Sequence, residues 1–158
     1  MRKLKITHWV AVFICSAAIM LSSNAQAQYR TGGGLLIDFG DGITLVGPHI
    51  KHFFSANSAV EAAVLFDDSF TSIQGLYQYH QGISGANGLQ WYLGAGPAIS
   101  FANSDSEISL IGTLGLDYKI TNAPLAMSFD WRPRLALYDG GSDFLPGRFG
   151  IGFRYVFK

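Results

Sequence analysis

The chain has 158 residues, a formal net charge of zero, 19 glycines and a single cysteine, and only 14% of its residues are charged. Ordinary soluble domains contain about 25% charged residues, so this chain has few side chains with which to cover a water-exposed surface. Its few cations are scattered, which excludes the basic patch expected of a protein that binds nucleic acid. The length fits one domain.

The first 27 residues are typical of a cleaved secretory signal peptide. Arg2, Lys3 and Lys5 precede an apolar run from Trp9 to Leu21, and Ala25-Gln26-Ala27 has the small-x-small pattern of a cleavage site. An anchoring helix is the alternative, but this run is shorter than the roughly 20 residues that span a bilayer. We predict cleavage after Ala27, which leaves 8 Lys+Arg (11 less the three removed) against 11 Asp+Glu, a net charge of −3.

The single cysteine, Cys15, lies inside the apolar run after Phe13-Ile14. A lipidated cysteine would follow small residues at the end of such a run, so we do not expect a lipoprotein. The mature chain would then lack a thiol, which excludes disulfides, thiolate metal sites and a cysteine nucleophile.

The mature chain alternates apolar residues with small or polar ones, which is the period-two pattern of β-strands. Segments rich in Gly, Asn, Asp and Ser separate the strands. The predicted strands are 29–39, 43–54, 58–67, 71–80, 89–101, 107–120, 124–137 and 145–158. Each reaches the roughly 9–11 residues that a tilted transmembrane strand needs, and their number is even. We therefore predict an all-β fold, an eight-stranded antiparallel up-and-down transmembrane β-barrel over residues 28–158.

Three places interrupt the pattern. The alternation slips near Gly47-Pro48, and Pro133 falls on the apolar face, so both positions predict β-bulges. The segment from Tyr138 to Phe144 is rich in Gly and Asp and is expected to be the last loop. All loops are short, which disfavours an adhesin.

The last strand defines the two faces of the predicted barrel. Its odd-numbered residues from Phe149 to Phe157 are large and apolar, whereas Arg148 and Arg154 share the other face with glycines. A soluble barrel would turn the apolar face inward. The polar faces, however, carry mostly small residues and charges of both signs, which suits a narrow, filled lumen in which charges pair.

The residues expected in this lumen charge network are Glu61, Asp117, Lys119, Asp130, Arg132, Arg134, Arg148 and Arg154. The arginines could instead form an anion-binding or gating site. Aromatic residues near the periplasmic strand ends are expected to form an interfacial girdle, namely Tyr29, Tyr77, Tyr79, Trp91, Tyr118, Tyr155 and Phe157.

Three segments carry a family resemblance: Leu93–Ile99, Ser128–Pro133 and Phe153–Phe157. With them the chain resembles the small eight-stranded outer-membrane β-barrel proteins of Gram-negative bacteria, the OmpA and OmpX barrel type. The resemblance implies an integral protein of the bacterial outer membrane, in contact with outer-membrane lipid and lipopolysaccharide. It also implies that the barrel assembly machinery recognises the C-terminal strand, although here Lys158 follows the final aromatic residue.

Catalytic, metal and phosphate sites find little support. A lipid A-modifying enzyme would need Ser, His and a carboxylate together near the outer leaflet, but His52 and His80 fall toward the periplasmic strand ends and no His-x-Ser pair occurs. The acidic segments 67–68 and 139–143 lack the spacing of a calcium loop. Residues 32–34 are three glycines without the Lys-Ser/Thr of a phosphate loop.

We therefore predict no catalytic residue, no metal and no cofactor. The expected protein is a monomeric, non-enzymatic outer-membrane barrel with a structural or envelope-interaction role and no nucleic-acid partner. Two alternatives stay open: a lipid A deacylase or acyltransferase, and a soluble periplasmic, lipocalin-like binding barrel.

Overall fold

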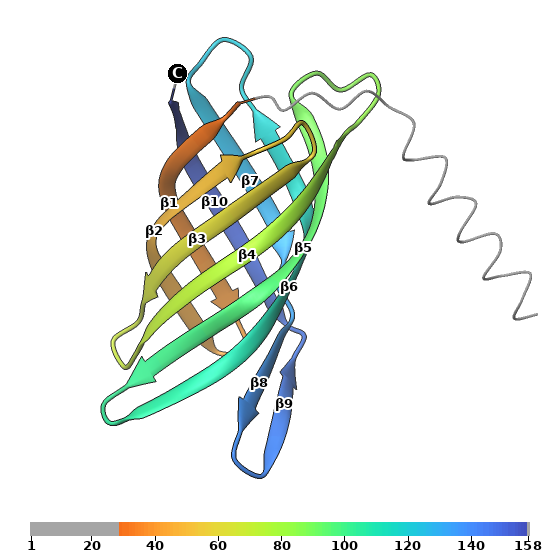
Figure 1. Ribbon diagram of the computed structural model, residues 1–158. Helices are drawn as coiled ribbons and strands as arrows, with labels where there is room; N and C mark the ends of the chain where they lie inside the picture. Colours follow the sequence, from red (N-terminus) through yellow and green to blue (C-terminus); the bar gives the residue numbers. More distant parts are fainter. Residues whose placement is uncertain (1–28, 158) are drawn as a thin grey trace, which may run out of the picture.

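The computed structural model describes residues 29–157 and consists of antiparallel strands (Figure 1). The strands are β1 (Thr31–Gly40), β2 (Ile43–Phe53), β3 (Ser58–Phe66), β4 (Thr71–Gly82), β5 (Leu89–Ala102), β6 (Asp105–Lys119), β7 (Leu125–Trp131), β8 (Arg134–Tyr138), β9 (Gly141–Leu145) and β10 (Arg148–Phe157). The predicted signal peptide with Cys15, and the terminal Lys158, lie outside the described residues. Within residues 29–157, no helix is long and apolar enough to cross a bilayer.

The sheet closes on itself. β1 pairs with both β2 and β10, and β5 pairs with both β4 and β6. β7 and β8 both pair with β6 in one register, with Trp131 opposite Leu114 and Arg134 opposite Ile111, so they form one interrupted strand. β9 and β10 likewise supply the last strand. The prediction of an all-β, eight-stranded antiparallel barrel is confirmed.

The predicted bulge at Pro133 lies instead on the opposite strand. From Trp131 to Arg134 the chain advances three residues, while their partners Phe149 and Leu145 are four apart, so the last strand holds one extra residue at Pro146-Gly147. Pro133 cannot donate a hydrogen bond. Its carbonyl still accepts one from the Gly112 amide at 2.9 Å, which keeps the strand in register with β6.

The prediction of a loop from Tyr138 to Phe144 is wrong. β8 and β9 continue as a hairpin beyond the barrel wall (Figure 1), and they turn at Asp139-Gly140. Gly140 has a φ of +98°, which glycine adopts without strain, so a Gly-rich segment makes a tight turn here rather than a long loop.

The predicted bulge at Gly47-Pro48 is also wrong. β2 runs in unbroken register against β1, where Pro48 lies opposite Leu35. Against β3, the pairs Val46–Phe66 and His49–Ala63 have the same register on both sides of the proline. Pro48 is exposed on the outer face of the barrel, and its missing donor interrupts one ladder without adding a residue.

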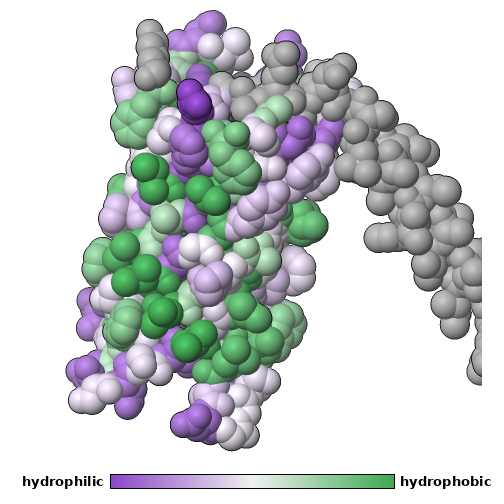
Figure 2. Space-filling model, viewed as in Figure 1, coloured by the Kyte–Doolittle hydropathy of each residue, from purple (hydrophilic) through white to green (hydrophobic). Residues whose placement is uncertain are grey.

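The barrel has an inverted distribution of polar and apolar side chains. Among the described residues, more polar or charged residues than hydrophobic ones are buried, and the buried hydrophobic residues form three small clusters. Large hydrophobic side chains such as Leu35, Leu93 and Phe129 are more than half exposed, and Figure 2 shows hydrophobic residues spread over the strands. The interior therefore differs from the apolar core of a soluble domain.

Gly34 of β1 lies opposite Arg154 of β10, with the β10 backbone close to its Cα atom. A Cβ atom added at Gly34 would overlap the carbonyl oxygen of Phe153, whereas one added at Gly75 of β4 meets nothing within 4 Å. We expect Gly34→Ala to lower the free energy of unfolding by about 1–3 kcal/mol through this clash. Urea titration of the refolded protein measures it. Gly75→Ala is the matched control, and equal losses in the two variants would contradict the explanation.

Candidate functional site

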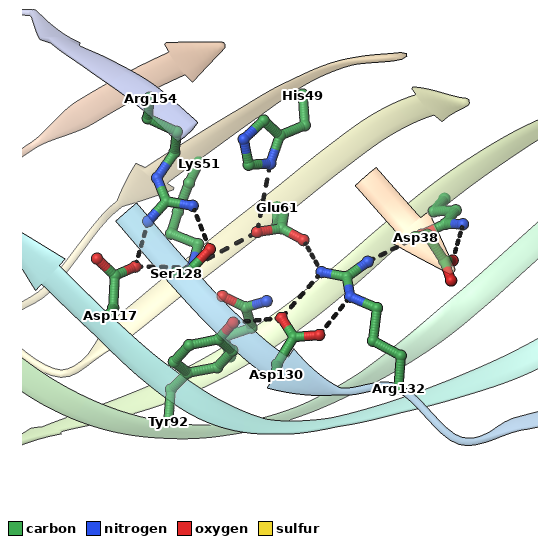
Figure 3. Close-up of polar contacts among 12 residues, drawn as sticks. Asp38, His49, Lys51, Glu61, Tyr92, Asp117, Ser128, Asp130, Arg132 and Arg154 are labelled. Atoms are coloured by element: carbon green, nitrogen blue, oxygen red, sulfur yellow. Dashed lines mark hydrogen bonds and ion pairs between the residues drawn. The ribbon is translucent and has the colours of Figure 1, made fainter. Parts of the chain in front are cut away.

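The barrel interior holds an ion-pair network of six residues, called here the central network (Figure 3): Lys51, Glu61, Asp117, Asp130, Arg132 and Arg154. All six side chains are at most 1% exposed. They come from β2, β3, β6, β7 and β10, and from the break between β7 and β8. Alternate residues of these strands point inward, so the network is a consequence of strand register.

Arg132 joins two carboxylates on one side of the interior. Its Nη2 atom donates to Glu61 Oε1 at 2.6 Å, and its Nε atom donates to Asp130 Oδ1 at 2.6 Å. Its Nη1 atom also donates to Gln74 Oε1 at 3.2 Å. The Tyr92 hydroxyl donates to the other Asp130 oxygen. This guanidinium is therefore hydrogen-bonded through all three nitrogens, as a buried cation requires.

Asp117 is the centre of the other half of the network. It accepts from Arg154 Nη2 at 2.5 Å and from Lys51 Nζ at 3.0 Å, and Lys51 lies 3.5 Å from Glu61 Oε2. Arg154 also donates to the Tyr29 hydroxyl at 3.1 Å and to Ser128 Oγ at 3.0 Å. Lys51 thereby connects the two halves, and three cations balance three carboxylates.

A second group, called here the mouth cluster, consists of Asp38, Arg134 and Arg148. Arg148 donates to Asp38 Oδ1 from Nη2 at 2.8 Å and from Nε at 3.0 Å, and to the Gly40 carbonyl at 3.0 Å. Arg134 reaches Asp38 Oδ2 only through Nη2, at 3.3 Å. Gln74 donates to the same Asp38 oxygen at 3.4 Å and so links this cluster to Arg132.

Of the predicted charge-network residues, all but Lys119 are buried in these two groups. Lys119 was expected in the network, but its Nζ atom donates to the carbonyls of Ile120 and Ala123 at 2.7 and 2.6 Å. That expectation is wrong because Lys119 ends β6, where the turn leaves carbonyls without strand partners. Its long side chain bends to these carbonyls instead of entering the interior.

Tyr29 is a second correction, because it was expected in the exterior aromatic girdle. Its ring is 6% exposed and packs edge-on against Phe53, and its hydroxyl donates to Asp117 at 3.2 Å. The chain bends at Arg30 and β1 begins only at Thr31, so the alternation cannot be extended back to Tyr29. The other girdle residues face outward: Tyr77, Tyr118, Tyr155 and Phe157 are exposed, and Tyr79 and Trp91 are half-buried against each other.

Sequence reasoning missed Asp38 and Lys51 as members of the two groups, and Tyr92 as a hydrogen-bond partner of the central network. The predicted slip in the alternation at Gly47-Pro48 gave no basis for placing Lys51 in the interior. The alternation from Leu45 is in fact unbroken, and it turns Lys51 inward. Tyr92 offered a signal, because it is the one large side chain on a face otherwise made of Gln90, Gly94 and other small or polar residues of β5. It stacks on His80 at 4.8 Å and lies under the Lys51 ammonium at 4.3 Å.

The three histidines within residues 29–157 do not form a catalytic pair with serine. His52 bonds Thr31 Oγ1 at 2.9 Å, His80 contacts Gln78 Oε1 at 3.3 Å, and His49 lies 3.7 Å from Glu61. In residues 29–157 none of the three is hydrogen-bonded to a serine side chain. In the same range, no group of three or more His, Cys, Asp or Glu is placed to hold a metal ion.

Comparison with known proteins identifies the fold. The structure is similar to the N-terminal β-barrel domain of Pseudomonas aeruginosa OprF, with a TM-score of 0.56 and 20% sequence identity over 82% of this chain and 100% of that chain. No protein-family model matches the sequence, and no curated protein matches it. The likeness agrees with an eight-stranded barrel and extends over most of the chain.

Asp117 tests how far the central network supports the fold. Asp117→Asn removes the negative charge that pairs with the buried cations Lys51 and Arg154. We therefore expect the free energy of unfolding to fall by about 3–5 kcal/mol. Urea titration measures the loss. Asp68→Asn, in the exposed β3–β4 loop, removes the same charge and should change stability by about 0.5 kcal/mol or less. Similar values for the two variants would show that the buried pairs contribute nothing specific.

Proposed function

We propose that this protein is a non-enzymatic barrel of the bacterial outer membrane, with a structural or envelope-interaction role. The observation that carries the proposal is the inverted distribution of side chains. Ion pairs and glutamines fill the interior, and large hydrophobic residues cover the outer face of the strands. In water this arrangement would leave the apolar surface exposed and bury charges, at a cost in both respects. Contact with lipid on the outside of the barrel would remove the cost of exposing the apolar surface to water.

The aromatic side chains support the same placement. Tyr77, Tyr118 and Tyr155 point outward near one end of the barrel, and Phe66 and Phe101 are exposed near the other. Aromatic residues at both membrane interfaces are a feature of outer-membrane barrels. The hydrophobic band between them would contact lipid, and lipopolysaccharide would meet the strands at the end with the β8–β9 hairpin. This orientation puts both ends of the described chain at the periplasmic side (Figure 1).

A structural role fits the interior better than catalysis does. The central network fills the barrel with groups that already have partners, and the three histidines of the described residues lack a serine partner. The outward-facing odd residues of β10 also give the C-terminal strand the alternation through which the assembly machinery would recognise it. We further propose that the barrel is monomeric and reaches the outer membrane after cleavage of residues 1–27.

Leu35 provides the test of membrane insertion. It lies in the middle of β1, is 55% exposed on the outer face, and would contact lipid. An arginine at a lipid-facing position costs about 2–4 kcal/mol near the bilayer midplane. We therefore expect Leu35→Arg to reduce the folded, heat-modifiable protein recovered in outer-membrane fractions.

Ser69→Arg, in the exposed β3–β4 loop, adds the same charge away from the predicted lipid contact and should leave recovery unchanged. Recovery of the wild-type protein in the soluble periplasm would contradict the proposed location and favour a soluble binding barrel.

A further inference from the structure

The barrel end that carries the β8–β9 hairpin contains a cavity of about 460 Å³. Its walls include the apolar side chains of Ile43, Phe70, Ala136 and Leu145, and its lining includes both arginines of the mouth cluster. Arg134 and Arg148 are buried, at 5% and 2% exposure. The cavity thus combines an apolar wall with two desolvated guanidinium groups.

The charges of the mouth cluster do not balance. In the central network three cations face three carboxylates, but in the mouth cluster Arg134 and Arg148 share the single carboxylate of Asp38. Among the described residues, the only other side chain that donates a hydrogen bond to the Asp38 carboxylate is Gln74, which is neutral. Within the described residues, this cluster therefore carries one positive charge without a buried partner.

Arg134 is the residue that carries this surplus. The Asp38 oxygens already accept three hydrogen bonds from Arg148 and Gln74, and Arg134 makes one longer bond to them, from Nη2 at 3.3 Å. Its Nε atom is buried and lacks a hydrogen-bond partner among the described residues. A buried guanidinium nitrogen without an acceptor is costly, and an anion in the cavity would supply one.

The rim of the cavity limits which anion fits. Asp105, Glu107 and Asp143 line it and are exposed, and none of them is within ion-pair distance of either arginine in the described part of the chain. These carboxylates would repel a ligand with several negative charges. The apolar wall favours a ligand with a hydrophobic body.

We propose that this cavity binds a small organic monocarboxylate, with its carboxylate on Arg134 and its hydrophobic body against Phe70 and Leu145. The site is separate from the central network, and the proposal does not depend on the cellular location of the barrel. Arg148 is held by Asp38 and Gly40, so it positions Asp38, while Arg134 makes the contact with the ligand.

The probe is hydrocinnamate, titrated calorimetrically into the folded barrel in nonionic detergent. Phenylpropanol has the same hydrophobic body without the charge. We expect saturable binding of hydrocinnamate at one site per barrel, with an affinity at least about tenfold higher than that of the alcohol. Equal affinities, or no saturable binding of hydrocinnamate, would overturn the proposal.

Arg134→Gln should weaken hydrocinnamate binding by about tenfold or more and leave phenylpropanol unaffected. Arg30→Gln removes an exposed cation at the opposite end of the barrel and should bind like the wild type. Unchanged hydrocinnamate affinity in Arg134→Gln would refute the assignment. Circular dichroism and heat-modifiable migration show whether Arg134→Gln folds. If it does not, Ala136→Leu narrows the same cavity and should weaken the binding of both probes. Unchanged binding in Ala136→Leu would equally refute the assignment.

Discussion

A closed barrel of eight strands has an interior so narrow that its own side chains must fill it. Strand alternation sends every second residue inward, and in this chain those residues include charges of both signs. Each buried charge then requires a partner from another strand. Arg132 reaches Glu61 across 71 residues of sequence, and Arg154 reaches Asp117 across 37, so the ion pairs connect strands that the hairpin order alone leaves apart.

The same ion pairs also favour one strand register over the others. If β3 slipped by one residue, Glu61 would turn to the hydrophobic exterior and Arg132 would lose one of its two carboxylate partners. Buried ion pairs often add little net stability compared with apolar residues of the same volume. We therefore infer that the central network specifies which register forms, because every alternative leaves unpaired charges inside or places charges on the apolar face.

The barrel, its eight strands and most inward-facing charges could be predicted from the sequence, because period-two alternation is a local property. The errors occurred where a residue's environment depends on a neighbouring strand or on the turn or bend at a strand end. Pro133 marks an irregularity, but only the pairing of both neighbours shows that the extra residue lies at Pro146-Gly147. Lys119 fits the inward pattern, yet the carbonyls of the adjacent turn hold it. The partners of Arg134 likewise depend on three-dimensional positions that alternation does not supply.

That extra residue also shapes the mouth of the barrel. In β10 the even-numbered residues, such as Arg148 and Arg154, point inward. Beyond the bulge the parity changes, and Asp143 and Leu145 of β9 line the cavity. On an uninterrupted strand Leu145 would share the outer face with Phe149. The bulge thus turns an apolar side chain into the cavity that the mouth cluster lines. This end of the barrel therefore combines a hydrophobic wall with one cation in excess of its buried carboxylates, whereas the charges of the central network balance.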